Sequence, residues 1–277
     1  MQISKNEFSI LCFFLFFIIF IVLIDNSVEG KMGNKQTEKQ KIKLTVVFNN
    51  ISYSPELKTE WGYSCVIQTS KDTLLFDAGS NGKVLLSNIS QLNIDPHSIK
   101  SVIISHAHWD HLGGLADFLQ VNADVTVYIP NSFNRKIEKD IVKAGAKVVK
   151  VESFREITTN IFSLGELGEA IPEQSIAVRT SEGIVVITGC AHPGIVNIVK
   201  HARAIFSKEP IYLIMGGFHL RSYSSEKIKK IVKEIYELDV KYVAPSHCTG
   251  EKAIEIFEQI FGDNFIKSGV GKVIKIK

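Results

Sequence analysis

The segment Ser105-His106-Ala107-His108-Trp109-Asp110-His111-Leu112-Gly113-Gly114 decides how the chain folds and what it binds. It follows Val102-Ile103-Ile104, a short apolar run typical of a strand buried on both faces. Residues two apart in an extended segment point to the same side, so His106 and His108 can share one ion. Where the chain then turns into a helix, Asp110 and His111 come round by one turn and can serve a second ion.

The residue types in this segment favour a divalent metal. Imidazole and carboxylate suit zinc, with manganese and iron as alternatives, and the spacing allows one or two ions. The chain has 8 histidines in 277 residues, so three of them clustered at one strand end are improbable by chance. The Gly113-Gly114 pair lets the backbone pass close to the site. We therefore predict a metal centre built from His106, His108, Asp110 and His111.

Working outward from this segment, strand patterns alternate with amphipathic helices. Helical stripes are expected after Ser132, from Ile195, after Ser225 and from Thr249-Gly250. The expected strands cover residues 41–48, 63–69, 73–76, 101–105, 125–129, 146–151, 156–164, 176–180, 183–188, 210–215, 240–244 and 272–276. This mixture predicts an α/β fold in which helices cover sheets. Periodicity alone allows an αββα sandwich and a three-layer α/β sheet equally.

The metal-binding segment resembles the signature of the metallo-β-lactamase superfamily. Leu74-Leu75-Phe76-Asp77-Ala78-Gly79 is similar to its early strand motif, and Ser246-His247-Cys248-Thr249-Gly250 is similar to its last ligand motif. The resemblance implies an αββα sandwich of two mixed β-sheets covered by helices over residues 42–277. It also implies that Asp77 supports the site without binding metal and that His247 is a ligand.

A narrower resemblance points to one branch of that superfamily. The runs Gly189–Ile198, Gly216–Leu220 and His247–Gly250 look like the branch typified by the dihydropterin–aminobenzene ribotide phosphate synthases. Three motifs in this order make the branch assignment fairly specific. The substrate is not fixed by it, because one fold hosts many chemistries.

The chain departs from the superfamily pattern at two positions. Typical superfamily hydrolases carry a bridging aspartate where this chain has Cys190, and their usual third histidine falls in the region of Glu173-Gln174-Ser175. We therefore assign His192 as the compensating ligand. Cys190 is interpreted either as a thiolate ligand or supporting residue, or as a small buried core cysteine.

Two reaction classes and one inert alternative fit such a centre. In the first, a metal-activated water attacks an ester or phosphoester, with Asp110 orienting the water or taking its proton. His219 is then a catalytic group or substrate contact, or else a simple loop histidine. In the second, the chain is a transferase of the synthase branch that releases diphosphate, with Thr249 and Gly250 as an anion site. The third alternative is a metal-binding module without catalysis.

The N-terminus and the composition predict the localisation, the domain boundaries and the kind of partner. Residues 8–24 are almost wholly apolar, so residues 1–24 are predicted to be an uncleaved membrane anchor, with secretion after signal-peptide cleavage as the alternative. Residues 25–41 are predicted to be a polar linker before the catalytic domain, residues 42–277. A net charge of +3 gives no reason to expect nucleic acid, and the expected partner is a small-molecule substrate, with or without a phosphate group.

Overall fold

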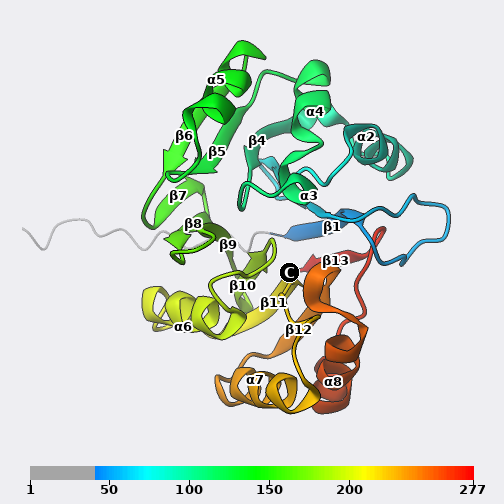
Figure 1. Ribbon diagram of the computed structural model, residues 1–277, viewed down its shortest axis with the longest axis vertical. Coiled ribbons are helices and arrows are strands. Elements are labelled where there is room, and N and C mark those ends of the chain that lie inside the picture. The colour runs from blue at the N-terminus through cyan, green and yellow to red at the C-terminus, as the bar shows by residue number, and fades with distance from the viewer. Residues whose placement is uncertain (1–40) are drawn as a thin grey trace, which may run out of the picture. The chain divides into compact units, whose positions relative to one another are not determined.

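A computed structural model describes residues 41–277 of the chain. The predicted anchor and nearly all of the predicted linker lie outside the described residues. Among residues 41–277, no helix is long and apolar enough to cross a membrane. The described part forms two mixed β-sheets whose outer faces carry helices (Figure 1), and this confirms the predicted sandwich over the three-layer alternative.

The first sheet has seven strands in the order β13-β1-β2-β3-β4-β5-β6. The strands from β3 to β6 pair in parallel, whereas β13, β1, β2 and β3 pair antiparallel. Parallel strands need crossover connections, and helices provide them on the outer face. The strand bounds are β1 (Ile42–Asn49), β2 (Tyr63–Gln68), β3 (Thr73–Phe76), β4 (Ile99–Ile103), β5 (Thr126–Pro130), β6 (Lys147–Val151) and β13 (Val273–Ile276).

The second sheet has six strands in the order β12-β11-β10-β9-β8-β7. Here β10, β11 and β12 are parallel, and β7 to β10 are antiparallel. The strand bounds are β7 (Arg155–Thr158), β8 (Ile161–Leu167), β9 (Glu173–Thr180), β10 (Gly183–Thr188), β11 (Ile211–Gly217) and β12 (Tyr242–Ser246).

Helices cover the outer face of each sheet (Figure 1). On the first sheet these are α2 (Gly82–Gln91), α3 (Trp109–Leu112), α4 (Leu115–Val121) and α5 (Arg135–Lys143). On the second sheet they are α6 (Ile195–Ile205), α7 (Ser225–Glu237) and α8 (Glu251–Phe261). Three short 3-10 turns complete the elements, η1 (Pro96–Ser98), η2 (His247–Thr249) and η3 (Gly262–Asn264).

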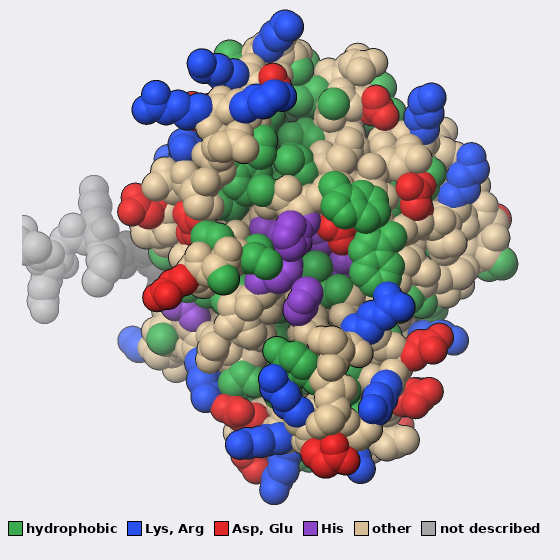
Figure 2. All heavy atoms as spheres, in the orientation of Figure 1, with side chains coloured by type: hydrophobic (Ala, Val, Ile, Leu, Met, Phe, Trp, Pro, Cys, Tyr) green, Lys and Arg blue, Asp and Glu red, His purple; other side chains and the backbone are tan. Residues whose placement is uncertain are grey.

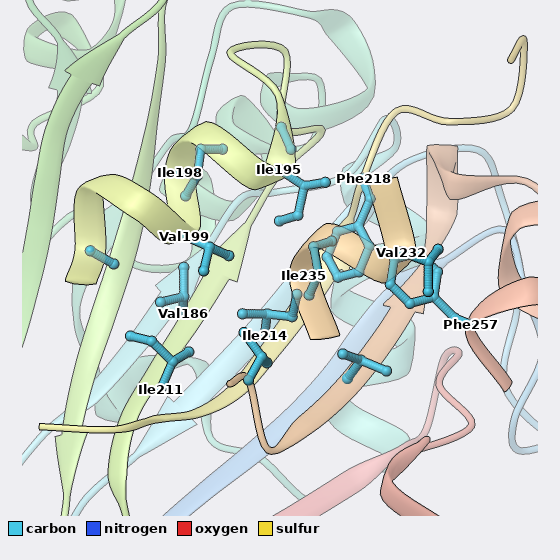
Figure 3. Packing of buried hydrophobic residues seen from close by; sticks show 14 of the residues in the cluster. Val186, Ile195, Ile198, Val199, Ile211, Ile214, Phe218, Val232, Ile235 and Phe257 are labelled. Atoms are coloured by element: carbon cyan, nitrogen blue, oxygen red, sulfur yellow. The ribbon is translucent and has the colours of Figure 1, made fainter. Parts of the chain in front are cut away.

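Three apolar clusters hold these four layers together, one for each interface between layers. The middle cluster joins the two sheets and includes Leu44, Phe76 and Ile187. An outer cluster joins the first sheet to α2, α4 and α5. The other outer cluster joins β10 and β11 to α6, α7 and α8, and Figure 3 shows its helix residues, such as Ile198 and Val232, over its strand residues, such as Val186 and Ile214. Strands buried on both faces explain the continuous apolar runs in the sequence.

Several predicted boundaries were wrong. The single strand expected over 156–164 is a hairpin of β7 and β8, with Asn160 at its turn at a φ of 66°. The helix expected after Ser132 is capped by Asn134, whose side chain accepts from the backbone N–H of Lys136 and Ile137. The helix expected from Thr249-Gly250 begins at Glu251, because residues 247–249 form a 3-10 turn.

Candidate metal centre

The first candidate ligand set lies where the chain leaves β4. His106 Nε2 and His108 Nδ1 are 3.0 Å apart, so the two rings face one point, as their two-residue spacing predicted. His192 reaches the same point from the loop between β10 and α6, and its ring centroid lies 4.6 Å from that of His106. The ligand atoms of these three histidines all lie within 4.8 Å of one another. Three imidazoles leave a tetrahedral ion one open position for water or substrate.

The second candidate set joins Asp110 and His111 to Cys190 and His247. His247 Nε2 lies 3.3 Å from Asp110 Oδ2, and His111 Nε2 lies 3.2 Å from Cys190 Sγ. Cys190 Sγ is also 3.5 Å from His247 Nε2. All four residues are buried. The sequence left open whether Cys190 is a ligand or a core residue, and the structure places its sulfur among the ligand atoms.

Asp77 supports both sets from a buried position. Its carboxylate accepts from the Ser105 backbone N–H at 2.6 Å and from the Ser105 hydroxyl at 2.8 Å. It also accepts from His111 Nδ1 at 2.6 Å. Ser105 Oγ in turn lies 2.9 Å from His106 Nδ1. The Nδ1 atoms of His106 and His111 are therefore both hydrogen-bonded. The lone pair on Nε2 of each ring is left to bind a metal. Burial raises the pKa of Asp77, and the hydrogen bonds from Ser105 offset part of that rise.

Glu173 was missed as a site residue by the sequence reasoning. Its fully buried carboxylate accepts four backbone N–H groups, those of residues 189–192, at 2.9 to 3.1 Å, and also His192 Nδ1 at 2.9 Å. Burial opposes its ionisation, but the hydrogen bonds from His192 and the nearby His106 outweigh burial and hold its pKa below the usual range. The sequence signal that could have indicated Glu173 was a charged residue at the start of a strand that is otherwise apolar enough to be buried.

Asn50 was also missed. Its side-chain oxygen lies 2.8 Å from His247 Nδ1, so the amide accepts from that nitrogen and His247 presents Nε2 to the second set. The neighbouring Asn49 donates through Nδ2 to Ser246 Oγ at 3.0 Å, which ties the end of β1 to the end of β12. A pair of asparagines after a strand resembles any polar loop, so the sequence carried no specific signal.

The backbone is constrained where the site is built. Four non-glycine residues at the site have positive φ, namely Asp77 at 58°, Ala191 at 60°, His219 at 52° and His247 at 51°. Such conformations are uncommon for side chains other than asparagine and aspartate and persist where the surroundings enforce them. They lie in four separate segments that meet at the centre. Loop conformation therefore contributes to placing the ligands.

Burial keeps the imidazoles of His106 and His111 neutral. Desolvation lowers the pKa of His106 to about 2, and the neighbouring His111 adds to this effect. Desolvation and the nearby His247 likewise lower the pKa of His111 to about 3. The neutral ring is the form that binds a metal. For Asp110, burial opposes ionisation, but a hydrogen bond with His247 and the nearby His111 ring lower its pKa below the usual range. This donor chemistry fits a divalent transition metal.

His219 lies beside both ligand sets. Its ring centroid is 4.5 Å from that of His192, and its ligand atom lies within 4.8 Å of those of Cys190 and His192. A hydrogen bond with Cys248 raises the pKa of His219. Burial opposes ionisation of the Cys248 thiol, but its hydrogen bonds with Cys190 and His219 lower its pKa well below the usual range. A cavity of about 260 Å³ adjoins His192 and His219 between α6 and α7.

The two residues suggested as an anion site have other contacts. The Thr249 hydroxyl is buried, donates to the Ser246 carbonyl at 2.6 Å and accepts from the Phe218 backbone N–H at 3.0 Å. Gly250 precedes α8 at a φ of 83°, and a Cβ there would lie 2.8 Å from the Arg221 Cα. Thr249 therefore stabilises the loop. Figure 2 shows a group of histidine side chains near the middle of this face, with hydrophobic and cationic side chains beside it.

Comparison with known proteins agrees with this geometry. A family model described as the metallo-β-lactamase superfamily matches residues 62–247. The chain belongs to the metallo-β-lactamase superfamily. A solved structure described as a metal-dependent hydrolase of the β-lactamase superfamily is 30% identical, with a TM-score of 0.70, and the match covers 85% of this chain and 99% of that one. The metallo-β-lactamase fold protein YhfI from Bacillus subtilis, 17% identical with a TM-score of 0.63, shares the fold over 86% of this chain and 100% of its own.

A curated relative agrees with the branch that the motifs indicated. It is the 7,8-dihydropterin-6-methyl-4-(β-D-ribofuranosyl)-aminobenzene-5'-phosphate synthase of Methanocaldococcus jannaschii. The two sequences are 29% identical over 83% of this chain and 95% of the relative. With the two ligand sets, of which the second is wholly buried, these likenesses make the chain a metal-dependent enzyme of the metallo-β-lactamase superfamily.

Proposed function

We propose that the chain is a metal-dependent hydrolase that uses activated water on a phosphoester or ester. The observation that carries the proposal is the pair of adjacent ligand sets, one of three histidines and one of Asp110, His111, Cys190 and His247. Metal ions bound there would lower the pKa of a water molecule towards about 7 and polarise the scissile group. Zinc suits the mixed nitrogen, sulfur and oxygen donors best, with manganese and iron as alternatives.

The residues of the chain then have distinct tasks. Asp110 lies at the edge of the second set, with its Oδ2 3.3 Å from His247 Nε2, and it orients the water or accepts its proton. His219 lies next to His192 outside the first set, where it donates a proton to the leaving group or stabilises developing charge. Asp77 and Glu173 hold the ligand imidazoles in place. The 260 Å³ cavity beside His192 and His219 offers room for part of the substrate.

A second candidate function is transfer with release of diphosphate, which the resemblance to the synthase branch implies. The observation that favours it is Cys190, which replaces the bridging carboxylate expected of the hydrolases in this superfamily. The same ligands would then hold a diphosphate leaving group, and a carbon nucleophile would take the place of water. An inert metal-binding module is the third alternative, and activity with either class of substrate would exclude it.

The first experiment measures metal content and turnover together on the full-length protein. Elemental analysis of the wild type and of a His106→Ala, His108→Ala double variant gives the identity and number of the ions. We expect bound metal, of which the double variant loses the ion of the first set, and metal-dependent release of nitrophenol from bis(4-nitrophenyl) phosphate. Metal-loaded protein that cleaves neither this diester nor 4-nitrophenyl acetate would contradict the hydrolase proposal. Release of diphosphate from a pterin diphosphate by an arylamine would then favour the transferase.

A further inference from the structure

Two aromatic residues stand beside the candidate metal ligands. The chain has 2 tryptophans, and both are here. The Trp61 ring lies against the His247 imidazole, with 5.0 Å between the ring centroids. Trp109 separates His108 from Asp110 and is 62% exposed. Its exposed ring, next to candidate ligands in sequence, is free to contact a molecule bound at the centre.

Arg221 lies over the Trp61 ring, with its guanidinium carbon 5.2 Å from the ring centroid. Its backbone is fixed by two segments, because it follows His219 closely in sequence and packs against Gly250, which follows η2. Gly250 has a φ of 83° and no Cβ, and this permits that close approach. Arg221 is therefore held one side chain away from the ligand His247.

Within residues 41–277, no carboxylate neutralises the charge of Arg221. Within residues 41–277, the arginine that forms an ion pair with a carboxylate is Arg179, with Glu209, and no carboxylate pairs with Arg221. Glu60, the acid next to Trp61 in sequence, accepts from Asn81 Nδ2 at 3.1 Å and from Ser80 Oγ at 3.4 Å instead. Stacking on an indole occupies the face of a guanidinium and leaves its N–H edges free. Those edges match two oxygens of a phosphate group.

We propose that Arg221, positioned by Trp61, binds a phosphate-type anion on the substrate beside the second ligand set, while exposed Trp109 contacts the organic part of the same substrate. The substrate class is thus an organic phosphate or phosphonate with an apolar or aromatic body. This inference rests on the proposed function only because both place the substrate at the same metal centre. Arg221 supplies affinity and orientation, and the chemistry stays with the groups around Asp110 and His219.

The test measures binding of phenylphosphonate, which has the anion and the ring but no scissile ester, to zinc-loaded full-length protein by calorimetry. Arg221→Ala should raise the Kd by about tenfold or more, because a charge-assisted hydrogen bond to an anion is lost. The Kd of Arg221→Lys should lie between those of the wild type and Arg221→Ala, since lysine keeps the charge but lacks the paired N–H donors of the guanidinium. Arg135→Ala, which removes another exposed arginine at the start of α5, is the matched control and should change the Kd by less than about twofold.

Trp61 is tested as a positioning residue by a double-mutant cycle. In a Trp61→Leu background, Arg221→Ala should have a clearly smaller effect on the Kd for phenylphosphonate, because the guanidinium is already free to move. Trp109→Leu should reduce the preference for phenylphosphonate over methylphosphonate, which has no ring. Zinc content is measured for every variant, so that a damaged metal centre is recognised.

Unchanged phenylphosphonate binding in Arg221→Ala, with unchanged zinc content, would overturn the proposal. If Arg221→Ala does not fold, Arg221→Gln gives the same comparison with an uncharged side chain of similar length. Binding is measured without turnover, so the outcome is separate from that of the hydrolase test. A protein that cleaves no phosphoester and still needs Arg221 for phenylphosphonate would sink the proposed reaction and leave the anion subsite standing.

Discussion

Glu173 and His192 act as a unit at the scale of single residues. Glu173 lies in the region where the third histidine of the superfamily is expected, and its carboxylate accepts from His192 on the neighbouring loop. The same carboxylate accepts four consecutive backbone N–H groups, from Gly189 to His192. One buried charge thus fixes both the loop that carries Cys190 and the ring that completes the first set.

Glu173→Gln should therefore weaken metal binding without removing a ligand. Whichever way the amide is turned, its NH₂ group faces N–H donors that the carboxylate accepted. We expect metal affinity to fall by about 10- to 100-fold, as for other partners of metal-bound histidines. The free energy of unfolding should fall by about 1–3 kcal/mol, because buried donors lose their acceptor. Competition with a chelator and urea unfolding measure the two effects.

The matched control for this prediction is Glu182→Gln, which changes an exposed glutamate in the turn between β9 and β10. That variant should keep wild-type metal affinity. Equal affinities for Glu173→Gln and the wild type would show that His192 is oriented by other contacts or does not bind metal.

Cys190 and Cys248 offer competing thiols, and spectroscopy of the cobalt-substituted protein can separate them. Cys248 has the more acidic thiol, but Cys190 Sγ is the sulfur that faces His111 Nε2 and His247 Nε2. Because position relative to the other ligands decides coordination, we expect the thiolate-to-cobalt charge-transfer band to be absent in Cys190→Ser and present in Cys248→Ser. The opposite pattern would assign the ligand to Cys248. Loss of the band should accompany weaker binding of one ion.

At the scale of elements, the sequence predicted the strands and helices whose apolar residues follow a clear local pattern. The apolar run before His106 and the alternation around Leu44 gave strands that the structure contains, because burial on one or two faces determines both patterns. The helices α2 and α4 were not predicted. Asn81 caps α2 with its side chain, but the cap precedes a weak mixture of apolar and polar residues. Tertiary packing against the first sheet, which no local pattern shows, stabilises both helices.

The candidate site was predictable to the same degree. The two-residue spacing was enough to predict that His106 and His108 share one ion. His247 was predicted as a ligand from the superfamily resemblance. His192 was predicted as a ligand because the chain departs from the superfamily pattern. Glu173 and Asn50 act through contacts between segments far apart in sequence, 19 residues for Glu173 with His192 and 197 for Asn50 with His247. Spacing rules cannot reveal such pairs, because the fold alone sets the distance between them.

The loop from β10 to α6 leads to a prediction at the scale of elements. A Cβ at Gly189 would lie 2.1 Å from Ser105 Oγ and 2.9 Å from Asp77 Oδ2. Gly189→Ala should therefore displace the Ser105–Asp77 pair that orients His106 and His111. We expect at least a tenfold loss of metal affinity. Gly262→Ala is the control, because a Cβ there meets nothing within 4 Å, and its positive φ should cost about 1–3 kcal/mol of stability without displacing a group of the metal centre. Chelator competition compares the two, and equal affinities would contradict the prediction.

At the scale of the whole described domain, the two sheets each provide part of the centre. The segments that follow β3 and β4 of the first sheet bring Asp77, His106, His108, Asp110 and His111. The segments that follow β10, β11 and β12 of the second sheet bring Cys190, His192, His219 and His247. Each ligand set contains residues from both sheets, so an ion bound there would link the two layers.

Metal removal should for this reason lower the stability of the whole domain, beyond any local effect on the loops. An ion that binds only the folded state stabilises it by RT ln(1 + [L]/Kd), about 2.7 kcal/mol at a free metal concentration 100 times the Kd. We expect the Tm to rise with free zinc concentration and to fall on addition of a chelator. The His106→Ala, His108→Ala variant should respond less, because it keeps only the second set. A Tm independent of zinc in metal-loaded wild type would mean that the ligand sets do not couple the sheets. The rise of Tm with zinc could instead be partly lost in the His106→Ala, His108→Ala variant and also partly lost in Cys190→Ser. That result would show that each ligand set contributes its own link between the two sheets.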